Sequence, residues 1–395
     1  MSKLLVIGNG FDLHCGLQST YNDFFEYLLK QKRFSNQLEQ THSIGDTANL
    51  WWALFYANKD DNRKWFWKDI EDLMFHFLFK KDETDYINID AFLNVLISAK
   101  DKLFSFDFLI TMEEIPNRKM ASFLQIIFYH GGFERFTKQD ITESVTKSFG
   151  FNQEIDYNRF NSRNFVIKSE DELVDILKTD LIEIENEFAK YLNSQLGNRH
   201  VDYKSNLTIE RLTGLSVVNS DTTKDLQILS FNYTRLGVSW GGDTRFGINL
   251  KNIHGTFLND DHPEIIFGVD SFNVNPKHPF YIFTKTFRVS FIETKNNKYE
   301  SQIVLKDIKE IIIYGHSLNY QDYSYFFAIF NVLNLNVSDL KVTLFYSNYN
   351  GIDRSNKNLL TLQDLIFEYE RLFKLPEGLY HRLLLEQRII VKRLS

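Results

Sequence analysis

The first residues that could do chemistry are two glycines at the end of an apolar run. Lys3-Leu4-Leu5-Val6-Ile7 is typical of a buried parallel strand, and Gly8-Asn9-Gly10-Phe11-Asp12 follows it directly. Backbone amides in such a turn can approach a phosphate, and a helix after the turn adds its positive N-terminal end. The third glycine of the dinucleotide fingerprint would fall on Leu13, so a plain strand-to-helix turn is about as good an interpretation. The pattern predicts that Gly8, Asn9, Gly10, Phe11 and Asp12 bind a nucleotide-type ligand.

A second candidate is an asparagine that follows a later β-rich run. Asn232 lies in Ser230-Phe231-Asn232-Tyr233-Thr234, directly after Leu226–Leu229. Open α/β sheets bind ligands at the carboxyl ends of their strands, where an Asn amide can orient a water molecule or a ribose hydroxyl. Capping of the next turn is an equally good explanation of an Asn at this place. Asn232 is therefore a candidate catalytic residue, with the capping alternative open.

A third candidate is the histidine of Asn252-Ile253-His254-Gly255. Histidine changes its charge near neutral pH and can act as a general base. A lone histidine is more often a hydrogen-bonded structural residue. Of the 10 histidines in the chain, however, only His254 lies between two other strand-end motifs. That order makes His254 the candidate base.

The fourth pattern is Ile311-Ile312-Ile313-Tyr314-Gly315-His316-Ser317-Leu318-Asn319, with Asp322 close behind it. One interpretation is another glycine turn that holds a phosphate or a ribose, with Gly315, His316, Ser317 and Asp322 as cofactor-binding residues. The other is a nucleophile elbow in which the Ser317 hydroxyl attacks the substrate. An elbow has a second glycine where Asn319 stands, and the one histidine after Ser317 is His381, in a segment typical of a helix. The glycine turn is therefore favoured.

These four patterns need a sheet to bring them together. Short β-rich runs, separated by polar or helical segments as in a doubly wound sheet, recur late in the chain: Leu226–Phe231, Asn252–Ile253, Glu264–Phe267, Ile311–Tyr314, Val342–Tyr346 and Arg388–Val391. The N-terminal strand finds its partners among them. Residues 1–30 and 225–395 are therefore predicted to form one α/β domain with a Rossmann-like parallel sheet, and residues 31–224 a mainly helical insertion.

The insertion is predicted from helical periodicity. Four segments show it: Trp65–Phe79, Ile89–Phe104, Met120–Phe128 and Asp171–Leu192. Residues 131–165 and 195–222 are polar and typical of loops. Within the first segment Trp67 and Glu71 lie one turn apart on one helix face, and a core Trp beside a solvated Glu is the simpler account of them.

Composition limits the classes of function. The net charge is −7, whereas a general nucleic-acid binder usually carries a basic balance. The single cysteine, Cys15, excludes an intramolecular disulfide and a four-cysteine zinc site, and no metal site is predicted. No apolar run reaches the roughly 18 residues of a membrane helix, and the first strand begins at once. These features predict a cytoplasmic protein without membrane contact.

In their order along the chain, the motifs resemble the AbiH family of bacteriophage abortive-infection proteins. The resemblance rests on Leu5–Leu13, on Gly16-Leu17 with Ser19-Thr20-Tyr21 and Phe24, on Trp67–Glu71, and on the motifs at 231–234, 253–255 and 314–318. It implies an antiphage effector. A phage-derived trigger or a partner protein, and assembly into a homo-oligomer, are compatible with that role.

The motifs also resemble, more distantly, the SIR2-like group, in which four such motifs line one NAD pocket. This likeness implies NAD or a related nucleotide as ligand, with Asn232 positioning water or ribose, His254 as general base and Ser317 contacting ribose or phosphate. Phe11-Asp12 replaces the small Ser-type continuation of sirtuins, and Cys15 stands alone where deacylating sirtuins have zinc-binding cysteines. Protein deacylation is therefore not expected.

The predicted function is hydrolysis of the N-glycosidic bond of NAD or a related nucleotide during phage infection. Two alternatives stay open. One is a module that senses the nucleotide without turnover and passes its state to a partner. The other is a nuclease with Asp12, Glu71 and Asp270 as metal ligands, against which the acidic balance and the lack of a tight carboxylate cluster count.

Overall fold

The computed structural model of the chain describes fifteen stretches of the sequence. They are residues 2–39, 49–58, 67–80, 87–93, 119–120, 123, 170–197, 209–219, 226–234, 236, 249–257, 264–272, 274–296, 302–347 and, after a further gap, 355–394. All statements below concern these residues.

The chain forms two compact units. One comprises Met1–Thr20 with Phe188–Ser395, and the other comprises Tyr21–Glu187. The second division falls inside helix α10 (Glu170–Gly197), because the Phe188 ring already packs on Tyr233 and Phe267 of the first unit, at 5.3 Å between ring centroids in both pairs. The divisions predicted from the sequence lie at residues 30/31 and 224/225.

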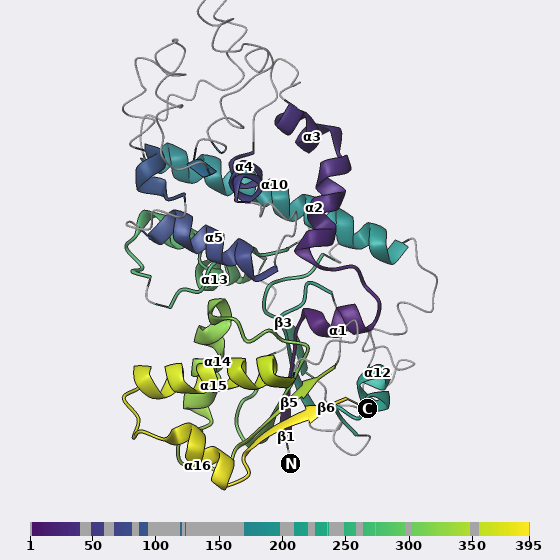
Figure 1. Ribbon diagram of the computed structural model, residues 1–395, viewed down its shortest axis with the longest axis vertical. Coiled ribbons are helices and arrows are strands. Elements are labelled where there is room, and N and C mark those ends of the chain that lie inside the picture. The colour runs from purple at the N-terminus through teal and green to yellow at the C-terminus, as the bar shows by residue number, and fades with distance from the viewer. Residues whose placement is uncertain are drawn as a thin grey trace, which may run out of the picture. The chain divides into compact units, whose positions relative to one another are not determined.

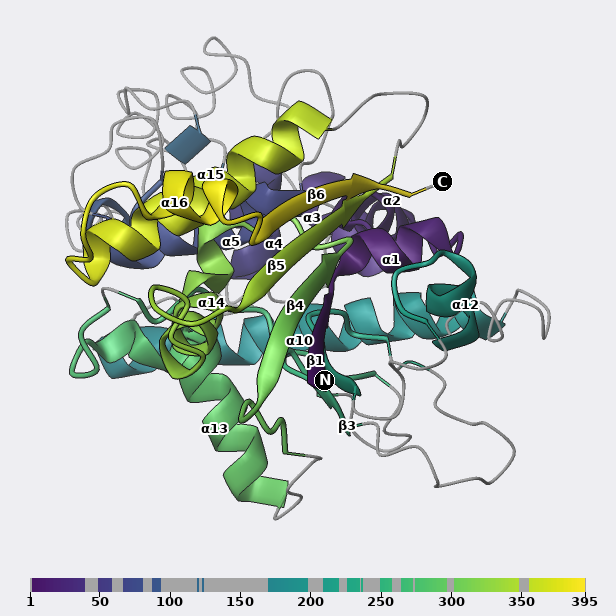
Figure 2. The ribbon, with the colours of Figure 1, turned by 90° about the horizontal axis from the view of Figure 1, so that it is seen from below.

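The first unit is built on a sheet of six strands, all of them parallel. The strands are β1 (Ser2–Ile7), β2 (Leu226–Ser230), β3 (Asn249–Asn252), β4 (Ile308–Tyr314), β5 (Lys341–Tyr346) and β6 (Ile389–Arg393). Figure 1 labels β1, β3, β5 and β6, and Figure 2 shows β1, β4, β5 and β6 side by side. Their order is β3-β2-β1-β4-β5-β6. This is the strand order of the doubly wound dinucleotide-binding fold. The prediction of an α/β, Rossmann-like sheet with a helical insertion is confirmed.

Continuous apolar strands are what a parallel sheet covered on both faces requires. Alternate residues of β1, β4 and β5 belong to one buried core with α14 (Tyr323–Val332) and α15 (Ser355–Leu372), and they include Leu4, Val6, Ile311, Ile313, Val342 and Leu344. Helix α16 (Leu379–Leu385) adds Leu383 to the same core just before β6. The helices thereby fix the outer half of the sheet.

The predicted strand at Glu264–Phe267 is wrong. This apolar segment does not join the sheet, although its central residues are buried. Its amides bond instead to the loop after β3, from Glu264 N to Thr256 O (3.0 Å) and from Ile266 N to His254 O (3.0 Å). The β-rich residues therefore form an extended segment outside the sheet, and this segment supports the loop that carries His254.

The described residues between 31 and 224 form helices and no strand. Besides α10, they include α3 (Lys32–Glu39), α4 (Leu50–Ala57), α5 (Trp67–Phe79) and α12 (Ile209–Gly214). Helices predicted at Trp65–Phe79 and Asp171–Leu192 are confirmed, whereas 131–165 and most of Ile89–Phe104 and Met120–Phe128 lie outside the described residues. The loop predicted at 195–222 is wrong where α10 ends at Gly197 and for α12, whose six residues are too few to show periodicity. No helix in the described segments has both the length and the apolar character that crossing a bilayer requires.

Candidate functional site

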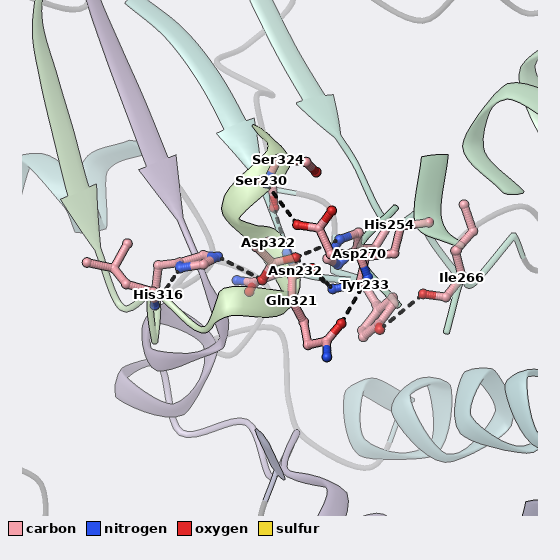
Figure 3. A network of polar contacts seen from close by, with 12 residues as sticks. Ser230, Asn232, Tyr233, His254, Ile266, Asp270, His316, Gln321, Asp322 and Ser324 are labelled. Carbon is pink, nitrogen blue, oxygen red and sulfur yellow. Dashed lines mark hydrogen bonds and ion pairs between the residues drawn. The ribbon is translucent and has the colours of Figure 1, made fainter. Parts of the chain in front are cut away.

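The four sequence motifs follow four neighbouring strands. The glycine turn comes after β1, Asn232 after β2, His254 after β3, and Gly315 with Asp322 after β4. Because these strands are parallel and adjacent in the order β3-β2-β1-β4, their carboxyl ends lie at one edge of the sheet. Figure 3 shows side chains from the end of β2 and from the segments that follow β2, β3 and β4 lying close together at this edge. The structure therefore brings the predicted candidates to one region of the first unit.

The glycines of the first turn allow two backbone segments to touch. A Cβ on Gly8 would lie 2.7 Å from Cα of His316, and one on Gly10 would lie 2.7 Å from Cα of Gly315. The Gly8 amide donates to Tyr314 O (3.1 Å) and the Gly10 amide to Gly315 O (2.7 Å). These two amides are thus already bonded to backbone. Binding of a phosphate at this turn stays a prediction, and groups of the turn other than these two amides would have to make the contact.

Helix α1 (Asn9–His14) carries the buried carboxylate of Asp12 beside the end of β2. Asn232 Nδ2 donates to Asp12 Oδ1 (2.9 Å), and Thr234 Oγ1 lies 2.9 Å from Oδ1 and 2.7 Å from Oδ2. Burial raises the pKa of Asp12 to about 7, while the hydrogen bonds from Thr234 and Asn232 oppose that rise. A carboxyl group that titrates near neutral pH is typical of functional sites.

The turn after β2 is held by a side chain at the end of β3. Asn252 Nδ2 donates to the carbonyl oxygens of Asn232 and Thr234, at 2.8 Å each. Asn232 itself is 3% exposed, and no described residue donates a hydrogen bond to its side-chain Oδ1. Buried polar atoms are nearly always hydrogen-bonded, to protein or to bound water. This oxygen is therefore an acceptor that a ligand or water can use.

Asp322 is the centre of the charged part of the site. It ends the short helix η4 (Tyr320–Asp322), and its Oδ1 lies 2.6 Å from Nζ of Lys285, the first residue of α13 (Lys285–Asn296). Nε2 of His254 lies 3.4 Å from Oδ1, and Nε2 of His316 lies 3.4 Å from Oδ2. Burial opposes ionisation, but the charge of Lys285 and the two imidazoles hold the pKa of Asp322 well below its ordinary value. The Asp322 side chain is thus a carboxylate that faces three basic groups.

The two histidines have different tasks. The Leu318 amide donates to Nδ1 of His316 (2.9 Å), so the neutral His316 ring carries its proton on Nε2, toward Asp322. His254 faces Asp322 with Nε2 as well, and a carboxylate favours a proton on that nitrogen. Burial and the charge of Lys285 lower the pKa of His254, while Asp322 opposes this. His254 is therefore neutral near pH 7, with Nδ1 as its basic nitrogen.

One aromatic ring contacts both imidazoles. The Phe231 centroid lies 5.4 Å from that of His254 and 4.3 Å from that of His316, with both rings edge-on to it. Tyr233, one residue before Thr234, donates from its hydroxyl to Ile266 O (3.3 Å). Phe231 and Tyr233, on either side of Asn232, thus both pack against His254, and Tyr233 also supports the segment at Ile266.

Sequence reasoning missed Lys285 and gave Asp270 a different role. No pattern in the sequence marks Lys285, a buried lysine at the start of an ordinary helix. Asp270 accepts hydrogen bonds from the amides of Phe272 and Ser324, at 2.8 Å each, and so caps the first turn of α14. Gln321 Oε1 accepts a hydrogen bond from the Asp270 amide (2.9 Å). Sequence reasoning also missed Gln321, and the one signal for it in the sequence is its position next to Asp322.

The described residues do not form the arrangement that either the nucleophile elbow or the nuclease would need. The Ser317 side chain is exposed, with no hydrogen bond to a described histidine or carboxylate, and His381 precedes β6 at the amino edge of the sheet. For the nuclease alternative, Glu71 belongs to the second unit. In the described part of the chain, no three His, Cys, Asp or Glu side chains are grouped as metal ligands.

Comparison with known proteins gives one match. Residues 4–346 match the family model described as Bacteriophage abortive infection AbiH. The matched range includes all four strand-end motifs, Asp12, Lys285 and strands β2 to β5. Neither the curated proteins nor the solved structures contain a match to the chain.

Proposed function

This chain belongs to the AbiH family of bacteriophage abortive-infection proteins, and we propose that it acts by hydrolysing the N-glycosidic bond of NAD or a related nucleotide. The observation that carries the proposal is the buried Asn232 Oδ1, which accepts no hydrogen bond from a described residue. Such an atom costs about 1–3 kcal/mol unless a ligand or water pairs with it. It lies at the carboxyl edge of a β3-β2-β1-β4-β5-β6 sheet, the edge at which this strand order binds dinucleotides.

The chemistry needs a water molecule, a base and a leaving group. In the proposed step the water oxygen bonds to C1′ of the ribose while the bond from C1′ to the nucleobase nitrogen breaks. The electron pair of that bond leaves with the nucleobase, through an oxocarbenium-like transition state. Asn232 Oδ1 holds the attacking water or a ribose hydroxyl, and the proton released by the water passes to His254.

His254 is suited to this task by its surroundings. Its lowered pKa keeps the imidazole neutral and able to accept a proton near pH 7. Once protonated, the ring faces the Asp322 carboxylate at 3.4 Å, which stabilises the imidazolium. Lys285, 2.6 Å from the same carboxylate, limits how strongly Asp322 attracts a proton to His254 before the reaction. The three side chains together set the proton affinity of the base.

The test is product analysis after incubating the pure full-length chain with NAD, NADP or ATP. Release of the free base with an equal amount of the ribosylated remainder is the expected result. His254→Ala should lower the rate by about 10²–10⁴, because it removes the general base. Asn232→Ala should abolish cleavage, and both variants should lose phage protection. His381→Ala and Asn356→Ala, which change exposed residues on α16 and α15, are the matched controls. Tight nucleotide binding without any product would reject hydrolysis and favour a sensor.

A further inference from the structure

We infer that Asp12 is a positioning residue: its carboxylate fixes the Asn232 side-chain amide so that the carbonyl oxygen, and not the NH₂ group, faces the ligand. The orientation itself is a property of this chain's contacts. Its importance for catalysis rests on the proposed function.

The direction of the amide follows from hydrogen-bond chemistry. An Asn side chain rotated by 180° exchanges its oxygen and nitrogen, and the surrounding donors and acceptors decide which orientation is adopted. Ionised Asp12 can only accept, and its Oδ1 lies 2.9 Å from Asn232 Nδ2. The rotated amide would place two oxygens at that distance. In its ionised form, Asp12 therefore excludes the rotated form.

Asp12 is itself held from two sides. The Thr234 hydroxyl lies 2.9 Å from Oδ1 and 2.7 Å from Oδ2, so both carboxylate oxygens have a neighbour in the protein. On the other side, Asp12 follows the glycine turn, where the Gly10 amide donates to Gly315 O. Because both of its carboxylate oxygens already have partners in the protein, Asp12 acts through Asn232 rather than by touching the ligand. A chain of contacts thus links the end of β4 to the Asn232 amide.

The fixed amide defines what the site accepts. Asn232 Oδ1 is a buried acceptor without a described donor, so the group that binds there must donate a hydrogen bond. A ribose hydroxyl or a water molecule meets this requirement. A phosphate oxygen or an unprotonated ring nitrogen does not. The position at Asn232 is therefore one for a hydroxyl or water.

The direct test follows the Asn232 side-chain amide by NMR in the full-length chain labelled with ¹⁵N-asparagine. The resonance that Asn232→Ala removes identifies the group. Its NH₂ hydrogens should exchange slowly in the wild type and in Asp12→Asn, whose side-chain oxygen still accepts. Exchange should be about tenfold faster or more in Asp12→Ala. Asp339→Ala, which changes an exposed residue, should leave the exchange unchanged. Slow exchange in folded Asp12→Ala would overturn the inference.

A pH titration keeps the inference testable if Asp12→Ala fails to fold. The Asn232 resonance should shift with a midpoint near 7 in the wild type, because the pKa of Asp12 is raised to about 7. Asp12→Asn should remove this shift, whereas Asp339→Asn should not. Burial and the charge of Asp12 raise the pKa of the neighbouring Cys15 thiol to about 12, outside this range. A shift of the same size in Asp12→Asn would overturn the inference.

Activity separates this inference from the proposed function. Asp12→Ala should lower kcat with little change in KM, and Asp12→Asn should restore most of the loss. Turnover of NAD with wild-type kcat in Asp12→Ala would reject the positioning role and leave the proposed function standing. Altered Asn232 exchange in a protein that leaves NAD intact would reject the proposed function and leave the orientation standing.

Discussion

Nζ of Lys285 lies 2.6 Å from Oδ1 of Asp322, and both side chains are buried. The two residues are 37 positions apart in the sequence and come from two different helices. The same carboxylate faces Nε2 of His254 and Nε2 of His316. The ion pair therefore both compensates a buried charge and sets the electrostatic environment of the candidate base.

Removing the cation should destabilise the fold. Lys285→Met leaves the Asp322 carboxylate without its closest partner, and breaking a buried pair in this way costs about 3–5 kcal/mol. The free energy of unfolding, measured by urea denaturation, should fall by an amount of that order. Lys341→Met, at an exposed lysine of β5, is the matched control. Equal stability of the two variants would show that His254 and His316 alone suffice for Asp322.

The glycine turn should tolerate no side chain. Gly10→Ala places a Cβ 2.7 Å from Cα of Gly315, a backbone atom that cannot move aside cheaply. Overpacking of this kind costs about 1–3 kcal/mol. Gly214→Ala at the end of α12 meets nothing within 4 Å and should be neutral or slightly stabilising. Thermal unfolding of both variants checks this, and an unchanged Tm for Gly10→Ala would contradict the contact with β4.

The stability of the protein should depend on Asp12 in a defined pH range. Its pKa is raised from 3.8 to about 7 on folding, so between these values the folded state binds a proton that the unfolded state lacks. Stability from this group is therefore lost as pH rises from about 4 to about 7. Asp12→Asn removes the titration, so its stability relative to the wild type should increase over this range.

Urea denaturation at several pH values between 5 and 8 measures this difference. Asp339→Asn serves as the exposed control and should run parallel to the wild type. A constant difference between Asp12→Asn and the wild type at every pH would mean that the Asp12 carboxyl does not titrate between these values in the folded protein.

The two interpretations of the motif after β4 predict opposite effects. Ser317 is exposed, and a ribose or phosphate contact there would be one of several, so Ser317→Ala should reduce NAD cleavage only in part. Asn232→Ala should abolish it, with a stability change of about 1 kcal/mol. A nucleophile elbow requires the reverse order. The rates of NAD loss for both variants, with circular dichroism as the fold control, distinguish the mechanisms.

The sequence by itself determined the local features of this protein. Each of the six strands was predicted to within a few residues, because a short β-rich run, in several cases ending in Gly, Asn or Asp, is a property of neighbouring residues. The candidate residues Asn232, His254 and Asp322 were found for the same reason, since each follows such a run. Glu264–Phe267 shows where this reasoning fails: an apolar run also suits an extended segment that bonds to a loop.

Only the tertiary structure decided which candidates meet. Asp12 bonds to Asn232 across 220 positions of the sequence, and Lys285 reaches Asp322 from a helix that no motif marks. These contacts depend on the order of the strands and on the close approach of the β1 turn to the end of β4. Periodicity encodes burial of each element separately and carries no information about strand order. The burial that raises the pKa of Asp12 and lowers that of His254 therefore exists only once the sheet is assembled.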